Sequence, residues 1–186
     1  VLGFEGELFA VIHLMIAGRL RWLAPGAKLP GKLALASFDF EHGQLVLTEA
    51  GTTRRASIHV VADEAGLQAL DPGGIDVMAC SAEAFATRLK SENHTLKRAL
   101  TDPRLFSGIG NAYSDEILHR ARLSPVALSR SLKPDEVHRL HEAARAVLVE
   151  WTDRLRAEAG DRPRKVTAFH PQMAVHGRYG QPCPVC

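Results

Sequence analysis

The sequence predicts an α+β protein in which strands come first and helices follow. Residues 1–62 contain short apolar runs between turn residues, and Ala36, Phe38 and Phe40 recur at every second position, the period of a β-strand with one buried face. From residue 81 onward, apolar residues recur at helical spacing instead. Strands followed by helices are typical of the α+β class.

The predicted strands are short and joined by turns. Apolar segments lie at residues 8–12, 20–22, 34–40, 45–47 and 58–61. Glycine and proline punctuate them, at Gly18, Pro25, Gly26, Pro30, Gly31 and Gly43. Strand, turn and strand at this spacing predict an antiparallel sandwich or barrel.

Helices are predicted after a linker. Residues 63–80 are expected to be irregular, since Asp71-Pro72-Gly73-Gly74 breaks regular structure. Helical signals mark residues 81–90, 94–101 and 110–122, and the longest helix begins at Pro134 and ends at residues 160–163. We therefore expect a helical domain over residues 81–163 and a tail of little regular pattern over residues 164–186.

Composition limits the classes of function. The chain has 186 residues, of which 46% are hydrophobic and 24% charged, enough for one ordinary core or two small ones. The net charge is only +2. Residues 93–133, however, hold seven Lys or Arg against three Asp or Glu, a local +4. This excess suits a phosphate-binding surface or, equally, a solvated basic face.

Cysteine and apolar content argue against a secreted or membrane protein. Three cysteines are too few for a disulfide-built scaffold. No apolar run approaches the roughly 20 residues that cross a bilayer, and no signal peptide is visible. The chain begins in what resembles the middle of a strand and ends abruptly at Cys186, so we expect a fragment that lacks both native termini.

The segment Gly108-Ile109-Gly110-Asn111 precedes a predicted helix. Glycine permits positive φ angles and close approach of the backbone to a ligand. Amides at a helix start form a cradle for an anion, to which Asn111 adds a side-chain donor. A phosphate held there fixes the register on DNA but reads no base. By itself the turn is more often an ordinary connection between helices.

Residues 97–125 closely resemble the helix-two-turn-helix of the formamidopyrimidine-DNA glycosylase and endonuclease VIII family. Three further segments are similar to family motifs, in the same order along the chain: the hairpin at residues 13–18, the loop at Arg54-Arg55 and the entry into a zinc hairpin at residues 175–186. The resemblance implies a β-sandwich, here partial, then a helical DNA-binding domain, with residues 164–186 as the lead-in and first half of the zinc hairpin.

The resemblance also implies site residues. The DNA-binding residues that it implies are Lys97, Gly108, Gly110, Asn111, His13, Arg54, Arg55, His176 and Arg178. Ile16 and Arg54 would fill the space left by an extruded base. The chain departs from the family pattern in having His176 where many relatives have Tyr, Ile16 where they often place Met, and Ala56 where they place Phe. These departures leave the lesion open: an oxidised pyrimidine, an abasic site or another.

Some of these residues also have a purely structural interpretation. Lys97 could be a solvated lysine, His13 a satisfied histidine at a strand end, and Arg54-Arg55 a charge pair at the end of a strand.

Cys183-Pro184-Val185-Cys186 supplies two thiolates at the spacing of tetrahedral zinc sites. A redox pair is the alternative, but a glycine and proline turn precedes these cysteines, which favours zinc. The resemblance implies one structural zinc in the full-length protein, completed by a second cysteine pair further on. Cys80 has no partner motif and is expected to be a small buried side chain.

The resemblance implies base-excision repair of damaged double-stranded DNA. Family members use an N-terminal proline amine as nucleophile, with a neighbouring glutamate, as bifunctional glycosylase and AP lyase. We nominate no catalytic residue within residues 1–186. We expect a bacterial, cytoplasmic, nucleoid-associated monomer that needs no nucleotide cofactor and no membrane. The alternative is a non-catalytic helix-two-turn-helix module that only binds nucleic acid.

Overall fold

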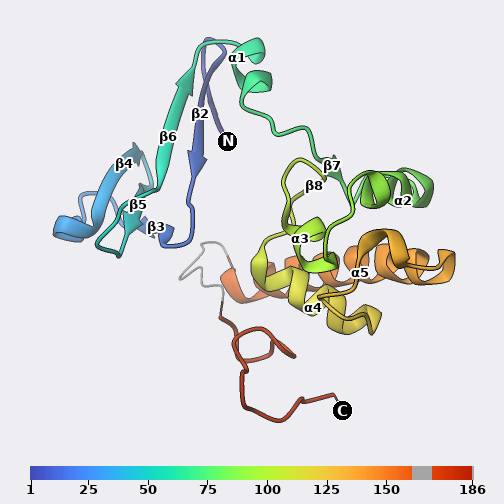
Figure 1. Ribbon diagram of the computed structural model, residues 1–186. Coiled ribbons are helices and arrows are strands. Elements are labelled where there is room, and N and C mark those ends of the chain that lie inside the picture. Colours follow the sequence, from blue (N-terminus) through green and yellow to red (C-terminus); the bar gives the residue numbers. More distant parts are fainter. Residues whose placement is uncertain (161–168, 186) are drawn as a thin grey trace. The chain divides into compact units, whose positions relative to one another are not determined.

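The computed structural model describes residues 1–160 and 169–185 (Figure 1). These residues fall into two compact units, which are described separately. The β unit comprises residues 1–71, together with Ala159, the last residue of the long helix, and Gly160. The helical unit comprises residues 72–158 and the C-terminal segment from residue 169.

The β unit contains two antiparallel three-stranded sheets. The first has the order β1 (Leu2–Phe4), β2 (Leu8–His13), β6 (Ser57–Val61). The second has the order β3 (Gly18–Leu23), β5 (Gly43–Glu49), β4 (Ala34–Phe40), with a 3₁₀ turn, η1 (Gly31–Leu33), before β4. The rings of Phe4 and Phe38 stack at 6.3 Å and join one sheet to the other. The antiparallel strands expected from the alternating pattern are confirmed.

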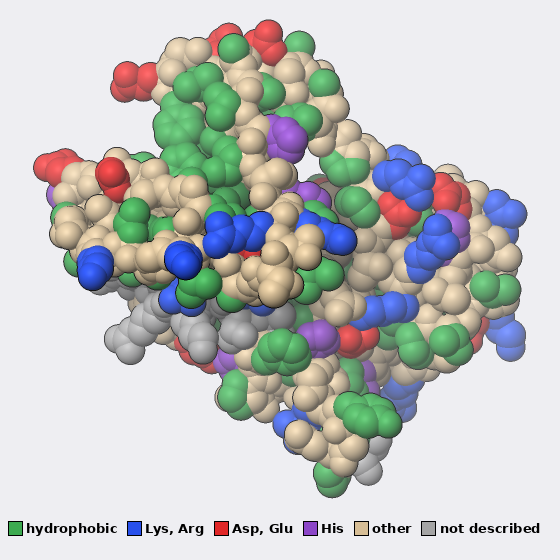
Figure 2. Space-filling model, turned by 60° about the vertical axis from the view of Figure 1, so that its left-hand side comes forward, with side chains coloured by type: hydrophobic (Ala, Val, Ile, Leu, Met, Phe, Trp, Pro, Cys, Tyr) green, Lys and Arg blue, Asp and Glu red, His purple; other side chains and the backbone are tan. Residues whose placement is uncertain are grey.

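The core of the β unit is centred on β5. Val46 and Leu47 are fully buried there because β5 is the middle strand of its sheet. Gly43 begins this strand beneath the Trp22 ring, where an added Cβ would lie 2.5 Å from ring atoms. The other sheet is only partly covered, since Phe4, Leu8 and Val60 are exposed, and hydrophobic side chains are visible over part of this unit in Figure 2.

The stretch expected to be an irregular linker, residues 63–80, contains two regular elements. Helix α1 (Glu64–Ala69) begins because the Asp63 carboxylate accepts a hydrogen bond of 2.6 Å from the Gly66 amide. Strand β7 (Ile75–Asp76) pairs in parallel with β8 (Phe106–Ser107). A two-residue strand depends on this distant partner, so local sequence could not reveal it.

Four longer elements build the helical unit: α2 (Ala82–Ser91), α3 (Leu96–Thr101), α4 (Asn111–Ala121) and α5 (Pro134–Ala159), with a 3₁₀ turn, η2 (Ser129–Ser131), before α5. Each begins within two residues of its predicted start. The helices share one hydrophobic core, whose fully buried members include Phe85, Leu89, Leu96, Leu100, Phe106, Ile117, Leu118, Leu140 and Met173. Within the described residues, no helix combines the length and apolarity needed to cross a membrane.

Residues 169–185 run as turns without helix or strand. The turns are closed by backbone hydrogen bonds, from Met173 to His170 at 3.0 Å and from Arg178 to Val175 at 3.1 Å. Met173 is buried in the helical core and anchors this segment. The lead-in predicted from residue 164 is therefore described only from Phe169 onward.

Candidate nucleic-acid interface

The turn before α4 has one anchored residue between two exposed glycines. Gly108 has a φ of 80°, in the left-handed region that favours glycine. Ile109 is only 7% exposed and packs into the helical core, whereas Gly110 and Asn111 are exposed. The buried isoleucine therefore fixes the turn, while the backbone on either side of it faces solvent.

The amides of the first turn of α4 are left open to a ligand. The first amides of any helix lack an intrahelical acceptor. In α2 the Ser81 hydroxyl caps the Ala84 amide, and in α3 the Leu96 and Lys97 amides donate to the carbonyls of Ala127 and Pro125. In α4 no side chain caps the helix from Gly110, and its first turn holds no acidic residue. This helix start can accept an anion.

Lys97 reaches the same helix start from α3. Its Nζ donates to the Asn111 carbonyl oxygen at 2.7 Å and to Asp115 Oδ1 at 2.5 Å. Its side chain is 27% exposed. The lysine is thus a partly exposed cation held beside the glycine turn, which is where a phosphate contact requires it.

His176 joins the cluster from the C-terminal segment. Its Nδ1 lies 2.8 Å from Asp115 Oδ2, and its ring stacks on Phe169 with 5.4 Å between ring centroids. Asp115 therefore bridges Lys97 and His176. Two predicted DNA-binding residues, Lys97 and His176, meet at one carboxylate that the sequence analysis did not single out, and Lys97 also contacts the backbone carbonyl of a third, Asn111.

Glu116 was also missed, and it holds His176 in place. The carboxylate is only 6% exposed and accepts three consecutive backbone amides: Ala174 at 2.8 Å, Val175 at 2.9 Å and His176 at 3.0 Å. These bonds satisfy a buried charge. The sequence signal was that Glu116 shares the buried face of α4 with apolar residues such as Ala112 and Ile117. An acidic residue on such a face needs a partner.

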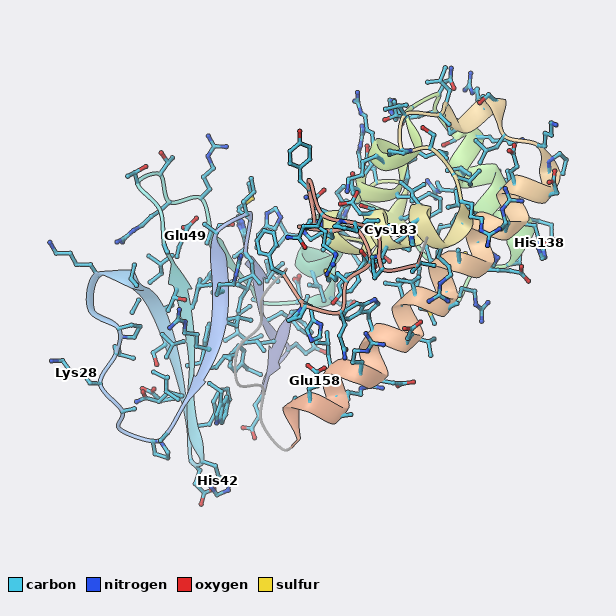
Figure 3. All side chains as sticks on the ribbon, turned by 90° about the horizontal axis from the view of Figure 1, so that it is seen from below. Lys28, His42, Glu49, His138, Glu158 and Cys183 are labelled. Atoms are coloured by element: carbon cyan, nitrogen blue, oxygen red, sulfur yellow. The ribbon has the colours of Figure 1, made fainter. Side chains whose placement is uncertain are left out.

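In the β unit, a buried carboxylate again accepts backbone amides, here beside the predicted DNA-binding residues. Glu49, labelled in Figure 3, is 2% exposed and accepts the backbone amides of Arg55 at 3.0 Å and Ala56 at 3.1 Å. His13 pairs in register with Ser57, immediately after this loop. A second arginine, Arg54, donates through Nη2 to the Lys32 carbonyl oxygen, so its guanidinium has a partner within the unit.

Ile16 lies on the turn between β2 and β3. The turn is closed by a bond of 2.8 Å from the Gly18 amide to the Leu14 carbonyl. Ile16 is 88% exposed at its tip, next to Met15 with a φ of 51°. An apolar side chain so exposed has the reach that a void-filling residue needs.

Arg178 points back into its own segment. Its Nη1 donates to the Pro171 carbonyl oxygen at 3.4 Å, and among the described residues its buried Nε has no acceptor. It does not join the Lys97, Asp115 and His176 cluster by any hydrogen bond between described residues.

The cysteine pair predicted to bind metal is described only in part. Cys183, labelled in Figure 3, lies beside α4, where its Sγ is 3.4 Å from His119 Nε2. Cys186 lies outside the described residues. Within residues 1–160 and 169–185, no three His, Cys, Asp or Glu side chains are grouped as metal ligands. The described donors therefore do not complete a zinc site.

Two ionisable groups near the helices have shifted pKa values with clear causes. Asp102, which precedes the glycine turn, accepts from Arg104 Nε at 3.0 Å and Nη2 at 2.6 Å, and this pairing lowers its pKa from 3.8 to about 2. Burial raises the pKa of the Cys80 thiol. Cys80 packs against the helical core, and a raised pKa disfavours the reactive thiolate.

Comparisons with known proteins agree with this geometry. The formamidopyrimidine-DNA glycosylase H2TH domain model matches residues 71–155. A formamidopyrimidine-DNA glycosylase of Thermus thermophilus is 41% identical over 107 residues, which are 55% of this chain and 40% of that protein. An uncharacterized formamidopyrimidine-DNA glycosylase-like protein of Mycobacterium tuberculosis is 38% identical over 120 residues, 64% of this chain and 72% of that protein.

Longer matches cover the whole chain. The formamidopyrimidine-DNA glycosylase of Chloroflexus aurantiacus is 31% identical over 193 residues, 100% of this chain and 68% of that protein. The crystal structure of the MutM (Fpg) protein of Thermus thermophilus aligns with a TM-score of 0.76 at 31% identity, over 98% of this chain and 69% of that one. The sequence thus spans between 40% and 72% of these relatives. The chain belongs to the formamidopyrimidine-DNA glycosylase family.

Proposed function

We propose that this chain binds damaged double-stranded DNA in base-excision repair, with the start of α4 holding a backbone phosphate. The observation that carries the proposal is the exposed, uncapped turn at Gly108–Asn111 with the Lys97 ammonium beside it. The open amides of the helix start and the Lys97 ammonium, which is also paired with Asp115, lie side by side at this turn, and both can donate to a phosphate oxygen. Several solved relatives are Lactococcus lactis Fpg complexes with DNA that contains an abasic site or Fapy-dG, although at 19–20% identity they support the fold alone.

The other predicted residues have supporting roles in this proposal. His13, Arg54 and Arg55 contact DNA from the β unit, where Glu49 holds the loop that carries the arginines. His176 contacts phosphate from the cluster on α4, and Ile16 enters the space of an extruded base. Arg178 contributes through its positive charge, since its guanidinium is turned toward Pro171.

The proposed reaction of the complete gene product is base removal followed by strand cleavage. The family resemblance implies attack of an amine on the sugar C1′, loss of the base, and a Schiff base that permits elimination. We assign the nucleophile to none of residues 1–186. Borohydride added to the complete gene product and an abasic-site duplex should trap a covalent adduct. Absence of an adduct on abasic and oxidised-base duplexes alike would reject the enzymatic part of the proposal.

Gly110→Ala tests the phosphate cradle with little effect on folding. Gly110 has a φ of −96°, which any residue adopts, and an added Cβ would meet nothing within 4 Å. Gly110 is the N-cap of α4, where alanine is less favourable than glycine, so stability should fall by no more than about 1 kcal/mol. A phosphate seated on the turn would instead collide with the methyl group. We expect affinity for an abasic-site duplex to fall about tenfold or more, ~1.4 kcal/mol.

Asn111→Ala and Lys97→Ala should weaken binding on all sequences alike, because the contacts are to the backbone. Lys97→Ala should also reduce the dependence of log affinity on log salt by about one unit. Lys133→Ala is the matched control, since it removes the same charge from an exposed position outside the cluster. Unchanged affinity in Gly110→Ala and Asn111→Ala together would remove the cradle. Equal affinity for damaged and intact duplexes would favour a module that only binds nucleic acid.

We also propose that Cys183 and Cys186 supply two of the four ligands of a structural zinc ion in the complete gene product. Their spacing supports this, and so does the position of Cys183 beside α4. Zinc bound there would be coupled to folding of the C-terminal segment. Metal analysis should find one zinc per chain, lost in Cys183→Ser. An unchanged zinc content in that variant would reject the assignment.

A further inference from the structure

The hydrogen bond between His176 and Asp115 decides which ring nitrogen carries the proton. His176 Nδ1 lies 2.8 Å from Asp115 Oδ2, while Asp115 Oδ1 accepts from Lys97 Nζ at 2.5 Å. An ionised carboxylate has no hydrogen to donate. The hydrogen between the two groups therefore belongs to Nδ1, and the imidazole donates.

The other nitrogen of the ring is then an acceptor. In a neutral imidazole with its hydrogen on Nδ1, Nε2 carries a lone pair. Among the residues that the structure describes, none forms a hydrogen bond with His176 Nε2, and the side chain is 11% exposed. A phosphate oxygen is also an acceptor only. It can bind Nε2 after that nitrogen has gained a proton, and not before.

The charges around the ring favour this protonation when DNA is present. Lys97 on α3 and Asp115 on α4 compensate each other, so a neutral His176 leaves the cluster without net charge. The second acidic group on α4, Glu116, accepts the backbone amide of His176. Arg178, on the same segment as the histidine, directs its guanidinium to Pro171. The imidazolium would give the Lys97, Asp115 and His176 cluster a net positive charge, as a phosphate site requires.

We propose that Asp115 is a positioning residue that keeps the proton of His176 on Nδ1, so that His176 binds phosphate only as an imidazolium and DNA binding takes up one proton. The inference rests on the proposed function. The proton comes from solvent, is added to Nε2, and is shared with a phosphate oxygen, while Nδ1 continues to donate to Asp115. A tyrosine at this position would instead donate its phenol hydrogen without any proton uptake. This chain therefore binds DNA more tightly as the pH falls, where a tyrosine would not.

The test compares the chain with His176→Tyr. Affinity for a duplex with a tetrahydrofuran abasic-site analogue is measured by fluorescence anisotropy at constant salt between about pH 5.5 and pH 8.5, the range in which histidine titrates. One linked proton makes the affinity of the wild-type chain fall by up to about tenfold per pH unit in the upper part of this range. His176→Tyr should show no such slope. Calorimetry in two buffers of different ionisation enthalpy should show proton uptake by the wild type alone.

Asp115→Asn tests the positioning role. An asparagine amide can donate to Nδ1 and move the hydrogen of the neutral ring to Nε2, so this variant should also lose the pH slope. Nitrogen-15 spectra of the imidazole in the DNA-free chain give an independent readout, because the neutral ring should carry its hydrogen on Nδ1 in the wild type and on Nε2 in Asp115→Asn.

The outcomes separate the inference from the function on which it rests. Equal pH slopes in the wild type and a folded His176→Tyr overturn the inference and leave DNA binding intact. A hydrogen on Nε2 in the neutral wild-type ring overturns it as well, even if the tyrosine variant does not fold. Failure of the wild-type chain to bind duplex DNA at any pH rejects the proposed function itself.

Discussion

Glu116→Gln should detach the segment that carries His176 from α4. The carboxylate accepts the amides of Val175 and His176 on Oε1 and that of Ala174 on Oε2, all between 2.8 and 3.0 Å. Glutamine has one oxygen. It can keep two of the three bonds and must then turn its amide group toward the third N–H, so that a donor faces a donor.

The size of the effect follows from these bonds. A hydrogen bond to a charged group contributes about 1.5–3 kcal/mol, and one such bond is lost. The two that remain become neutral and together weaken by roughly 1 kcal/mol. We therefore expect the segment to open about 2.5–4 kcal/mol more easily, which corresponds to a roughly 70-fold to 900-fold change in the opening equilibrium.

Amide hydrogen exchange is the direct assay. The three amides of Ala174, Val175 and His176 should lose protection by the factor given above, while amides in the middle of α5 keep theirs if the helical core stays folded. DNA affinity should fall at the same time, since His176 is no longer held beside Asp115.

Glu150→Gln is the matched control. Glu150 is an exposed glutamate that pairs with Arg120 at 2.6 Å and Arg154 at 3.1 Å and accepts no backbone amide among the described contacts. Exposed pairs contribute about 0–1 kcal/mol. If Glu116→Gln left the three amides as protected as Glu150→Gln does, the argument for a buried carboxylate anchor would be refuted.

Three further predictions concern stability and pH. Arg104→Gln should raise the pKa of Asp102 from about 2 toward 3.8, which an NMR titration of the carboxyl carbon would show; an unshifted pKa would refute the pairing. Because the pKa of Asp102 is depressed in the folded state, the pair stabilises the fold above pH 3.8, and this stabilisation is lost as the pH falls toward 2. In Gly108→Ala the added Cβ meets no atom within 4 Å, but alanine is forced to adopt a φ of 80°. Urea unfolding should therefore show a free energy of unfolding lower by about 1–2 kcal/mol, and an unchanged value would mean that the turn adopts another conformation. Leu140→Ala should destabilise the helical core by about 2–5 kcal/mol, against less than about 1 kcal/mol for Leu155→Ala at a site that is 40% exposed; equal effects would contradict the placement of α5.

The local elements of the fold could be predicted from the sequence because their signals are local. Ser81 caps α2, Pro134 begins α5, and alternation around Phe38 marks β4. Each signal acts through hydrogen bonds or dihedral preferences within a few residues. The glycine turn before Asn111 is local only in part: Gly108 and the helix that follows set its backbone conformation, but Ile109 fixes it by packing into the helical core.

Only the tertiary structure decided how the candidate site is completed. Asp115 and Glu116 are one pair of adjacent acidic residues in the sequence, yet one bridges Lys97 and His176 on the surface and the other is buried under the backbone of residues 174–176. Their partners on the C-terminal segment lie 58–61 positions away. Which acidic side chain faces solvent and which faces the core depends on how α4 is rotated against its neighbours, and that rotation is set by the summed packing of the whole helical core and not by any residue near the pair.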